Sequence, residues 1–217
     1  MTRNIAPHAA PRRPLVPRPP AITVIEPPPH EHGGTYRDAP PDTAELILMR
    51  RWRSPSTHLM LVFCILWDGF LALWYGGSAG APLSVKLFPL LHVGFGVYMT
   101  YSVAAQLFNT TIITASRRVL SIRHTPLPWP GGAQLPIDRI ETLYCEAQVR
   151  QDRDMSRACR LNAVMRDGTK RPLLSGLPDQ AQALFIERRL EHHFGLTDVE
   201  VAGELSAERP LGWRGLP

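Results

Sequence analysis

The sequence of 217 residues predicts an α+β membrane protein: a two-helix transmembrane hairpin, then a small cytoplasmic β-sheet or barrel capped by a C-terminal helix. Two observations predict this class. Two long apolar runs, 59–75 and 87–108, are separated only by a short turn. The segment after them alternates β-branched runs with turn residues and ends in one amphipathic helical pattern, which is typical of a compact β-rich module.

Composition divides the chain into four parts. Residues 1–45 contain 11 of the 22 prolines and no long aliphatic run, which predicts an extended tail with polyproline II character. Residues 46–108 form the hairpin segment, 109–195 the β-rich module, and 196–217 a second tail. The net charge of +5 is scattered along the chain rather than gathered in a stripe, which argues against nucleic-acid binding.

The two apolar runs are long enough to cross a bilayer. At 1.5 Å per residue they reach about 26 Å and about 33 Å. Pro89 falls in the first turn of the second run, where its missing N–H costs little. Both runs are apolar on all sides, whereas the alternative, a soluble helical hairpin, would show a single apolar stripe. The runs therefore favour membrane helices.

Charged and aromatic residues at the ends of the runs predict the orientation of the hairpin. Arginines lie before the first run and after the second, and the connection between the runs holds a single lysine, Lys86. Because positive charge collects on the cytoplasmic side, both termini are expected in the cytoplasm. The residues expected to anchor the helix ends at the membrane interfaces are Arg50, Arg51, Trp52, Arg53, Trp74 and Tyr75.

The module after the hairpin is expected to be mainly β. Short β-branched or alternating runs predict strands at 110–115, 119–123, 134–137 and 142–145. Asp167-Gly168, between two further runs, predicts a β-hairpin with a type I′ turn. Asp179 and Gln182 fit a capping box at the start of a helix, and Gly195 suits the position just after its end.

Three stretches of this region carry a resemblance: "FNTTIITASRRVLSIRHTPLPWPGG", "IETLYCE" and "RDGTKRPLLSGLPDQAQALFIERRLEHHFGL". Together they resemble uncharacterised bacterial membrane proteins that pair a two-helix hairpin with a pleckstrin-homology (PH)-like domain, over about residues 57–195. The resemblance implies a PH-like fold for 109–195 and a place in the bacterial inner membrane, cytoplasmic or intracytoplasmic. Some relatives carry a zinc-ribbon-like N-terminal segment, but this chain lacks the cysteines for one. The resemblance implies binding rather than a reaction.

Asp68 lies within the first span, where a carboxylate facing lipid is costly. Counted from the connecting turn, Asp68 lies about 10 Å deep and His92 of the second span about 8 Å deep. An antiparallel hairpin therefore predicts a structural Asp68–His92 pair. Two other interpretations stay open: a contact of Asp68 with another subunit, and a proton relay or a haem or chlorophyll ligated by His92. Nothing else in the sequence indicates a cofactor pocket.

Small residues in the spans permit close approach of helices. Gly94 and Gly96 could pack against Gly69 or against an adjacent subunit. Their spacing is GxG rather than GxxxG, so the absence of any packing role is an equal alternative.

Basic residues of the β module could form a rim that docks an anionic headgroup or a peptide: Arg117, Arg118, Arg123, Arg166, Lys170 and Arg171. The paired histidines, His30 and His32 in the tail and His192 and His193 near the end of the last helix, lack further ligands at a defined spacing. They are expected to be solvated, with no metal bound. The three cysteines form no CxxC motif and are expected to stay reduced.

Walker, HExxH and SxxK patterns are absent from the sequence, so we expect no catalytic residues and no enzymatic activity. The first functional hypothesis is a non-catalytic accessory subunit of a multi-subunit bacterial membrane complex, photosynthetic (reaction centre–antenna) or respiratory. Its partners would be other membrane subunits and the bilayer, with no nucleic acid or small-molecule substrate. The second is a free-standing membrane protein whose PH-like domain binds anionic lipid or a peptide. The third is a redox or proton-transfer protein that uses His92 and Asp68.

Overall fold

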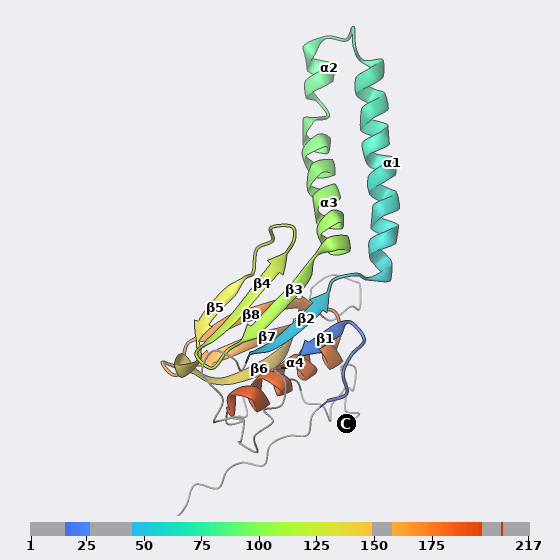
Figure 1. Cartoon of the computed structure of the whole chain (residues 1–217). Helices are drawn as coiled ribbons and strands as arrows, with labels where there is room; N and C mark the ends of the chain where they lie inside the picture. Colours follow the sequence, from blue (N-terminus) through green and yellow to red (C-terminus); the bar gives the residue numbers. More distant parts are fainter. Residues whose placement is uncertain (1–15, 27–44, 149–157, 197–204, 206–217) are drawn as a thin grey trace, which may run out of the picture. The chain divides into compact units, whose positions relative to one another are not determined.

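A computed structural model describes residues 16–26, 45–148, 158–196 and 205 (Figure 1). These residues form two compact units. The helical unit comprises Arg51–Thr110 and His124–Trp129. The β unit comprises the described residues up to Arg50, then Thr111–Arg123, then those from Pro130 onward.

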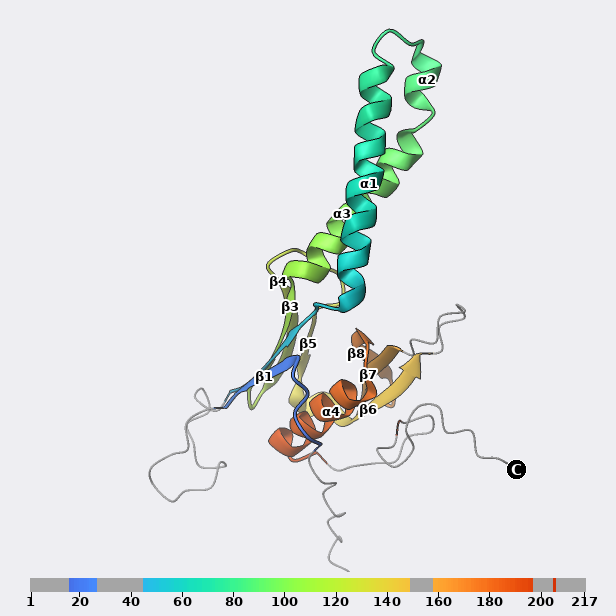
Figure 2. The same ribbon diagram turned by 90° about the vertical axis from the view of Figure 1, so that its right-hand side faces the viewer.

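The helical unit is a pair of long apolar helices that pack side by side (Figures 1 and 2). Helix α1 covers Pro55–Gly77 and helix α3 covers Leu90–Phe108, with the short helix α2, Leu83–Leu87, before α3. Pro55 suits the first turn of α1, where no backbone donor is needed. Pro89 is the N-cap of α3 and separates it from α2, because proline cannot donate the hydrogen bond that a continuous helix requires.

These helices confirm the coarse prediction of two spans. The segments Pro55–Gly77 and Leu83–Phe108 contain 18-residue stretches with mean hydropathies of 1.8 and 1.3, respectively, and both segments are long and apolar enough to cross a membrane. Within these apolar stretches, only 11% and 17% of the chain, respectively, are buried by the rest of the protein. Each span begins four residues earlier than the sequence predicts: α1 begins at Pro55, and the second span includes the short helix α2, although α3 itself begins at Leu90.

The β unit contains two antiparallel sheets and one helix. The five-stranded sheet follows chain order, with β1 (Ile22–Ile25), β2 (Leu46–Arg51), β3 (Thr110–Ala115), β4 (Val119–Thr125) and β5 (Ala133–Pro136). The three-stranded sheet contains β6 (Ile140–Gln148), β7 (Ala158–Met165) and β8 (Lys170–Leu177). A 3₁₀ turn, Ile137–Arg139, connects β5 to β6, and helix α4, Gln180–Phe194, follows β8.

One hydrophobic core joins both sheets to α4. Ile113 and Leu120 from the first sheet, Leu143 and Leu161 from the second, and Ile186 from α4 are at most 1% exposed and belong to the same cluster. The four strands expected before residue 146 are present, and the last helix is confirmed. Asp179 caps α4 by accepting from the Ala181 N–H at 3.0 Å, and Gly195 adopts the left-handed conformation with φ 64°.

Strands β1 and β2 correct the predicted domain division. Ile22–Ile25 lies inside the segment expected to be an extended tail, yet it pairs with β2, and Ile22 is buried in the core. Leu46–Arg51 lies inside the expected hairpin segment but is a strand of the same sheet. Four residues of β-branched character are enough for an edge strand, and the prolines around "ITVI" hide it in the composition.

The turn between β7 and β8 is a hairpin, as predicted, but not of type I′. A type I′ turn needs positive φ at both central residues, whereas only Gly168, with φ 79°, has it. The Met165 N–H donates to the Thr169 carbonyl at 2.8 Å, so the connection has three residues with glycine last. Asp167 Oδ1 accepts from the Thr169 N–H at 2.9 Å, which supports a three-residue loop of this kind.

Candidate functional site

The polar site of the helical unit is built from Asp68 on α1 and Thr100 on α3. The Thr100 hydroxyl donates to Asp68 Oδ2 at 2.7 Å. Opposite the same carboxylate, Gly96 is buried, and a Cβ placed there would lie 2.7 Å from Asp68 Oδ1. The missing side chain of Gly96 therefore makes the space in which the carboxylate lies.

The expected Asp68–His92 pair is not formed, which corrects the prediction. The His92 ring stacks on Trp67 with centroids 5.7 Å apart, and its Nδ1 has no hydrogen-bond partner among the described residues. Trp67 Nε1 donates to the His92 carbonyl at 3.2 Å. The estimate of depth from the connecting turn brought His92 close to the level of Asp68 along the helices. It did not account for direction, because adjacent residues of a helix point about 100° apart. Trp67 therefore faces His92, and Asp68 faces Gly96 and Thr100.

A groove of about 730 Å³ runs between α1 and α3, and Asp68 and Thr100 lie in its wall. Most of the lining is apolar, with Leu71, Val93 and Val97 among the contributors. Asp68 is half-buried and Thr100 is exposed. The site is thus a carboxylate that accepts a hydrogen bond from Thr100, set in an apolar groove that is open along the helices.

Of the three glycines expected to pack, only Gly96 makes a close approach within the chain. A Cβ on Gly69 or Gly94 would meet nothing within 4 Å. The close neighbours of Gly96 are the side chains of Trp67 and Asp68, not another glycine. Gly69 and Gly94 face open space in the chain as described.

An aromatic and proline-rich cluster belongs to the base of the helical unit, and sequence reasoning missed it. Trp52 makes edge contacts with Trp129 at 5.5 Å and with His124 at 5.1 Å. Tyr101 of α3 stacks on Trp129. The Asn109 side-chain Oδ1 accepts a hydrogen bond from the Leu127 N–H at 2.8 Å, and its Nδ2 donates to the Leu127 carbonyl at 3.0 Å. "PLPWPGG" reads in sequence only as a break, but its repeated proline and tryptophan were a usable signal.

The other expected membrane anchors have different fates. Arg53 donates to the Leu107 carbonyl near the end of α3 at 3.0 Å, and such a cation complements a helix C-terminus. Tyr75 donates to the Lys86 carbonyl at 3.0 Å and thereby ties α1 to α2. Trp74 is 40% exposed near the end of α1, and Arg51 is exposed. These four positions are compatible with the anchoring that the sequence predicts.

Arg50 is not a membrane anchor, which corrects another expectation. It is buried in the β unit, where its Nε donates to Gln182 Oε1 at 3.1 Å. Its guanidinium also donates to the Gly176 carbonyl at 3.4 Å. Burial lowers the pKa of Arg50 to about 10. Gln182, expected to complete a capping box, instead ties α4 to β2 through this arginine.

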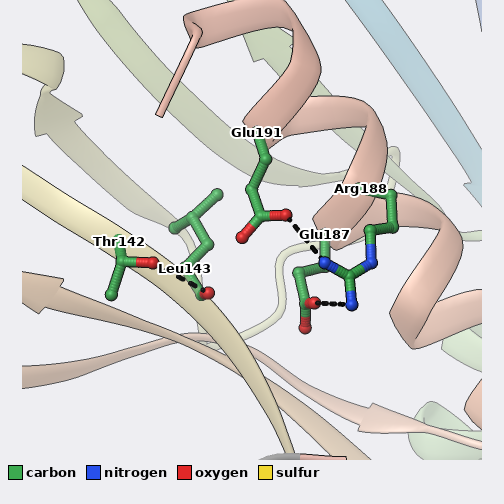
Figure 3. Close-up of polar contacts among 5 residues, drawn as sticks. All are labelled: Thr142, Leu143, Glu187, Arg188 and Glu191. Atoms are coloured by element: carbon green, nitrogen blue, oxygen red, sulfur yellow. Dashed lines mark hydrogen bonds and ion pairs between the residues drawn. The ribbon is translucent and has the colours of Figure 1, made fainter. Parts of the chain in front are cut away.

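A buried ionic cluster on α4 was not foreseen. Glu187, Arg188 and Glu191 are at most 8% exposed, although the helical pattern of this segment suggests a charged outer face. Arg188 lies 3.6 Å from Glu187 and 3.3 Å from Glu191. Figure 3 shows these side chains beside Thr142 and Leu143 of β6. Burial and the hydrogen-bonded Glu187 carboxylate raise the pKa of the nearby Cys145 thiol, which keeps the thiol neutral.

The expected basic rim is divided in the structure. Arg117 and Arg118 lie in the β3–β4 turn, and Arg123 lies five residues further along β4. Arg166 lies in the β7–β8 turn, whose backbone reaches the 3₁₀ turn through an Arg166 N–H to Arg139 carbonyl bond of 2.9 Å. Lys170 is engaged over the Tyr144 ring, 5.2 Å from its centroid. Arg171 is exposed on β8. The six residues therefore come from two sheets and do not share one strand or turn.

The remaining sequence expectations concern histidines and tails. His192 and His193 end α4, and burial lowers the pKa of His193. Groups of three or more metal-ligating side chains do not occur among the described residues. His30, His32 and most of 1–45 and 196–217 lie outside those residues, as does most of the polar stretch "QVRQDRDMSRA".

No protein-family model matches the chain, and no curated protein matches it. Function therefore has to be argued from the chain's own geometry.

Proposed function

We propose that the chain is a non-catalytic subunit of a multi-subunit bacterial membrane complex, whose hairpin packs against transmembrane helices of other subunits. The observation that carries this proposal is the Asp68–Thr100 pair in the open groove between α1 and α3. A carboxylate in the hydrocarbon region must face a partner, water or a protonating group. A carboxylate can accept about four hydrogen bonds, and among the described residues Thr100 donates one of them.

The shape and composition of the groove fit a neighbouring helix. Its walls are mostly apolar, so van der Waals packing of a helix with small residues would fill it. A hydroxyl, amide or basic side chain on that helix would reach Asp68. The low burial of both spans within the chain leaves most of their surface for lipid or for such neighbours.

The β unit supports a docking role on the cytoplasmic side. A five-stranded and a three-stranded antiparallel sheet, followed by a helix that completes the core, have the element order expected of a PH-like domain, with extra strands at the start. We propose that the unit belongs to that class, as the resemblance of residues 57–195 implies, and that the host is a photosynthetic or respiratory assembly. Such domains bind partners rather than perform reactions.

Purification in mild detergent tests the proposal. The wild-type chain is expected to elute together with partner proteins. The apparent mass of this complex should be far larger than that of a single 24.3 kDa chain in a detergent micelle. Asp68→Leu removes the acceptor and should release the chain from its partners. The matched control Leu73→Ala alters an exposed residue of α1 that does not line the groove, and should leave the complex intact.

Two results would contradict the proposal. One is a wild-type chain that elutes alone while other membrane complexes of the same extract stay intact. The other is an Asp68→Asn chain that assembles normally but loses a measurable proton- or electron-transfer activity, which would favour the redox interpretation of Asp68 and His92.

A further inference from the structure

Strand β6 lies at one edge of its sheet. It is the outer strand of the three-stranded sheet and pairs on one side with β7. The Leu205 N–H donates to the Cys145 carbonyl at 2.7 Å, and the Thr142 hydroxyl lies 3.4 Å from the Leu143 carbonyl. Backbone groups of alternate residues point to the same side of a strand. Leu143, Cys145 and Ala147 therefore direct their N–H and C=O groups away from β7.

Leu205 already occupies this edge. It lies ten residues after Gly195, is 7% exposed and belongs to the hydrophobic core of the β unit. Its backbone hydrogen bond to Cys145 is of the kind that an added strand makes with a sheet edge. A peptide that adds to a sheet as a strand binds by two kinds of contact: main-chain hydrogen bonds to the edge and side chains buried in pockets. Leu205 makes both kinds of contact.

Helix α4 packs against the same strand and shares the hydrophobic core with Leu205. Figure 3 shows Glu187, Arg188 and Glu191 of α4 beside Thr142 and Leu143 of β6. Arg188 lies within 3.6 Å of Glu187 and 3.3 Å of Glu191. The site thus offers main-chain acceptors from β6 and an apolar core that α4 helps to form.

We infer that the β6–α4 edge is a docking site for an extended peptide segment with an aliphatic anchor, and that the chain's own Leu205 occupies it in cis. A partner segment of the same chemistry takes the edge when Leu205 leaves. This inference does not rest on the hairpin, so its failure leaves the proposed membrane function untouched.

Peptide binding to the full-length chain in detergent tests the inference. The probe is a fluorescent peptide with the sequence of residues 197–217, followed by anisotropy. It is expected to bind the Leu205→Asp chain at least ten-fold more tightly than the wild-type chain, whose edge is already filled. A probe carrying Leu205→Asp should bind neither chain, whereas a control probe carrying Leu211→Asp should bind like the unaltered probe.

Several outcomes would overturn the inference. The first is equal binding of the unaltered probe to wild-type and Leu205→Asp chains, and the second is equal binding of the unaltered and Leu205→Asp probes. A wild-type dimer that Leu205→Asp converts to a monomer would instead show that Leu205 docks on a second copy, which overturns occupation in cis. Circular dichroism verifies folding, and Leu205→Ala replaces Leu205→Asp if the charged variant unfolds.

Discussion

At the scale of single residues, Asp68 shows how an apolar helix accommodates a carboxylate. Thr100 donates to it, and Gly96 leaves room for it. Each element contributes one part: α1 carries the acceptor, and α3 carries the donor and the gap. The three positions should therefore respond to substitution as a coupled group.

Gly96→Ala tests this coupling. The new methyl group would lie 2.7 Å from Asp68 Oδ1 and 3.2 Å from Trp67 Cδ1, so the carboxylate must move and its bond to Thr100 must lengthen. We expect the hairpin to lose about 1–3 kcal/mol of stability, as for other overpacked sites. Unfolding in detergent micelles, followed by circular dichroism, measures the change.

Gly94→Ala is the matched control, because a Cβ there meets nothing within 4 Å. The stability of its hairpin should equal that of wild type or exceed it slightly, since alanine favours helix. If both alanine variants unfold alike, Gly96 has no special packing role. If Gly94→Ala keeps a stable hairpin but loses partner proteins on purification, a neighbouring subunit contacts Gly94.

Arg50 and Arg51 illustrate what could be predicted from sequence at this scale and what could not. Successive residues of a strand point to opposite faces, so Arg50 is buried and Arg51 is exposed on β2. Charge counting treats the two arginines alike and assigns both to the membrane interface. Only the alternation of "LILMRR" could have separated them, and it is visible only once the segment is known to be a strand.

At the scale of elements, strong local signals were predicted well and tertiary ones were not. The apolar runs, the strand alternation after residue 109 and the caps of α4 are all local, and the structure contains the corresponding elements. The partner of Asp68, the buried charges of α4 and the pairing of β1 depend on which surfaces meet. A single sequence contains no direct record of which surfaces pack together.

Strand β1 gives a prediction at the same scale. Ile22 is 2% exposed and packs in the core, whereas Ile25, three residues later on the same strand, is 48% exposed. Ile22→Ala should lower the stability of the β unit by about 2–5 kcal/mol, because it leaves a cavity. Ile25→Ala should change stability by about 0.5 kcal/mol or less.

Hydrogen exchange of the β-unit amides in the full-length chain measures both effects. Equal protection in the Ile22→Ala and Ile25→Ala chains would contradict the assignment of β1 to the core. The segment would then behave as the tail that its proline content suggests.

At the scale of the whole molecule, the charge pattern predicts the orientation of the spans, and labelling tests this prediction. Gly80 lies in the connection between α1 and α2, where a side chain meets nothing within 4 Å. The three cysteines of the chain are buried, so they should react little with a maleimide. We expect a membrane-impermeant maleimide to label Gly80→Cys in intact spheroplasts.

The control is Arg171→Cys, an exposed position of β8. Because the positive-inside rule predicts a cytoplasmic β unit, this cysteine should react only after the membrane is opened. Labelling of Arg171→Cys alone in intact spheroplasts would reverse the topology. Labelling of both variants would contradict a membrane-spanning hairpin.

The order of the strands has a consequence for biosynthesis. Strands β2 and β3 are neighbours in one sheet, yet the chain between them makes the whole of α1, α2 and α3. During translation, β1 and β2 are synthesised first. Strand β2 then lacks its neighbour β3 until both apolar helices have been synthesised. The β unit can close only after that point, so synthesis of the hairpin must precede completion of the domain, and residues 109–195 expressed alone would lack two strands of the first sheet.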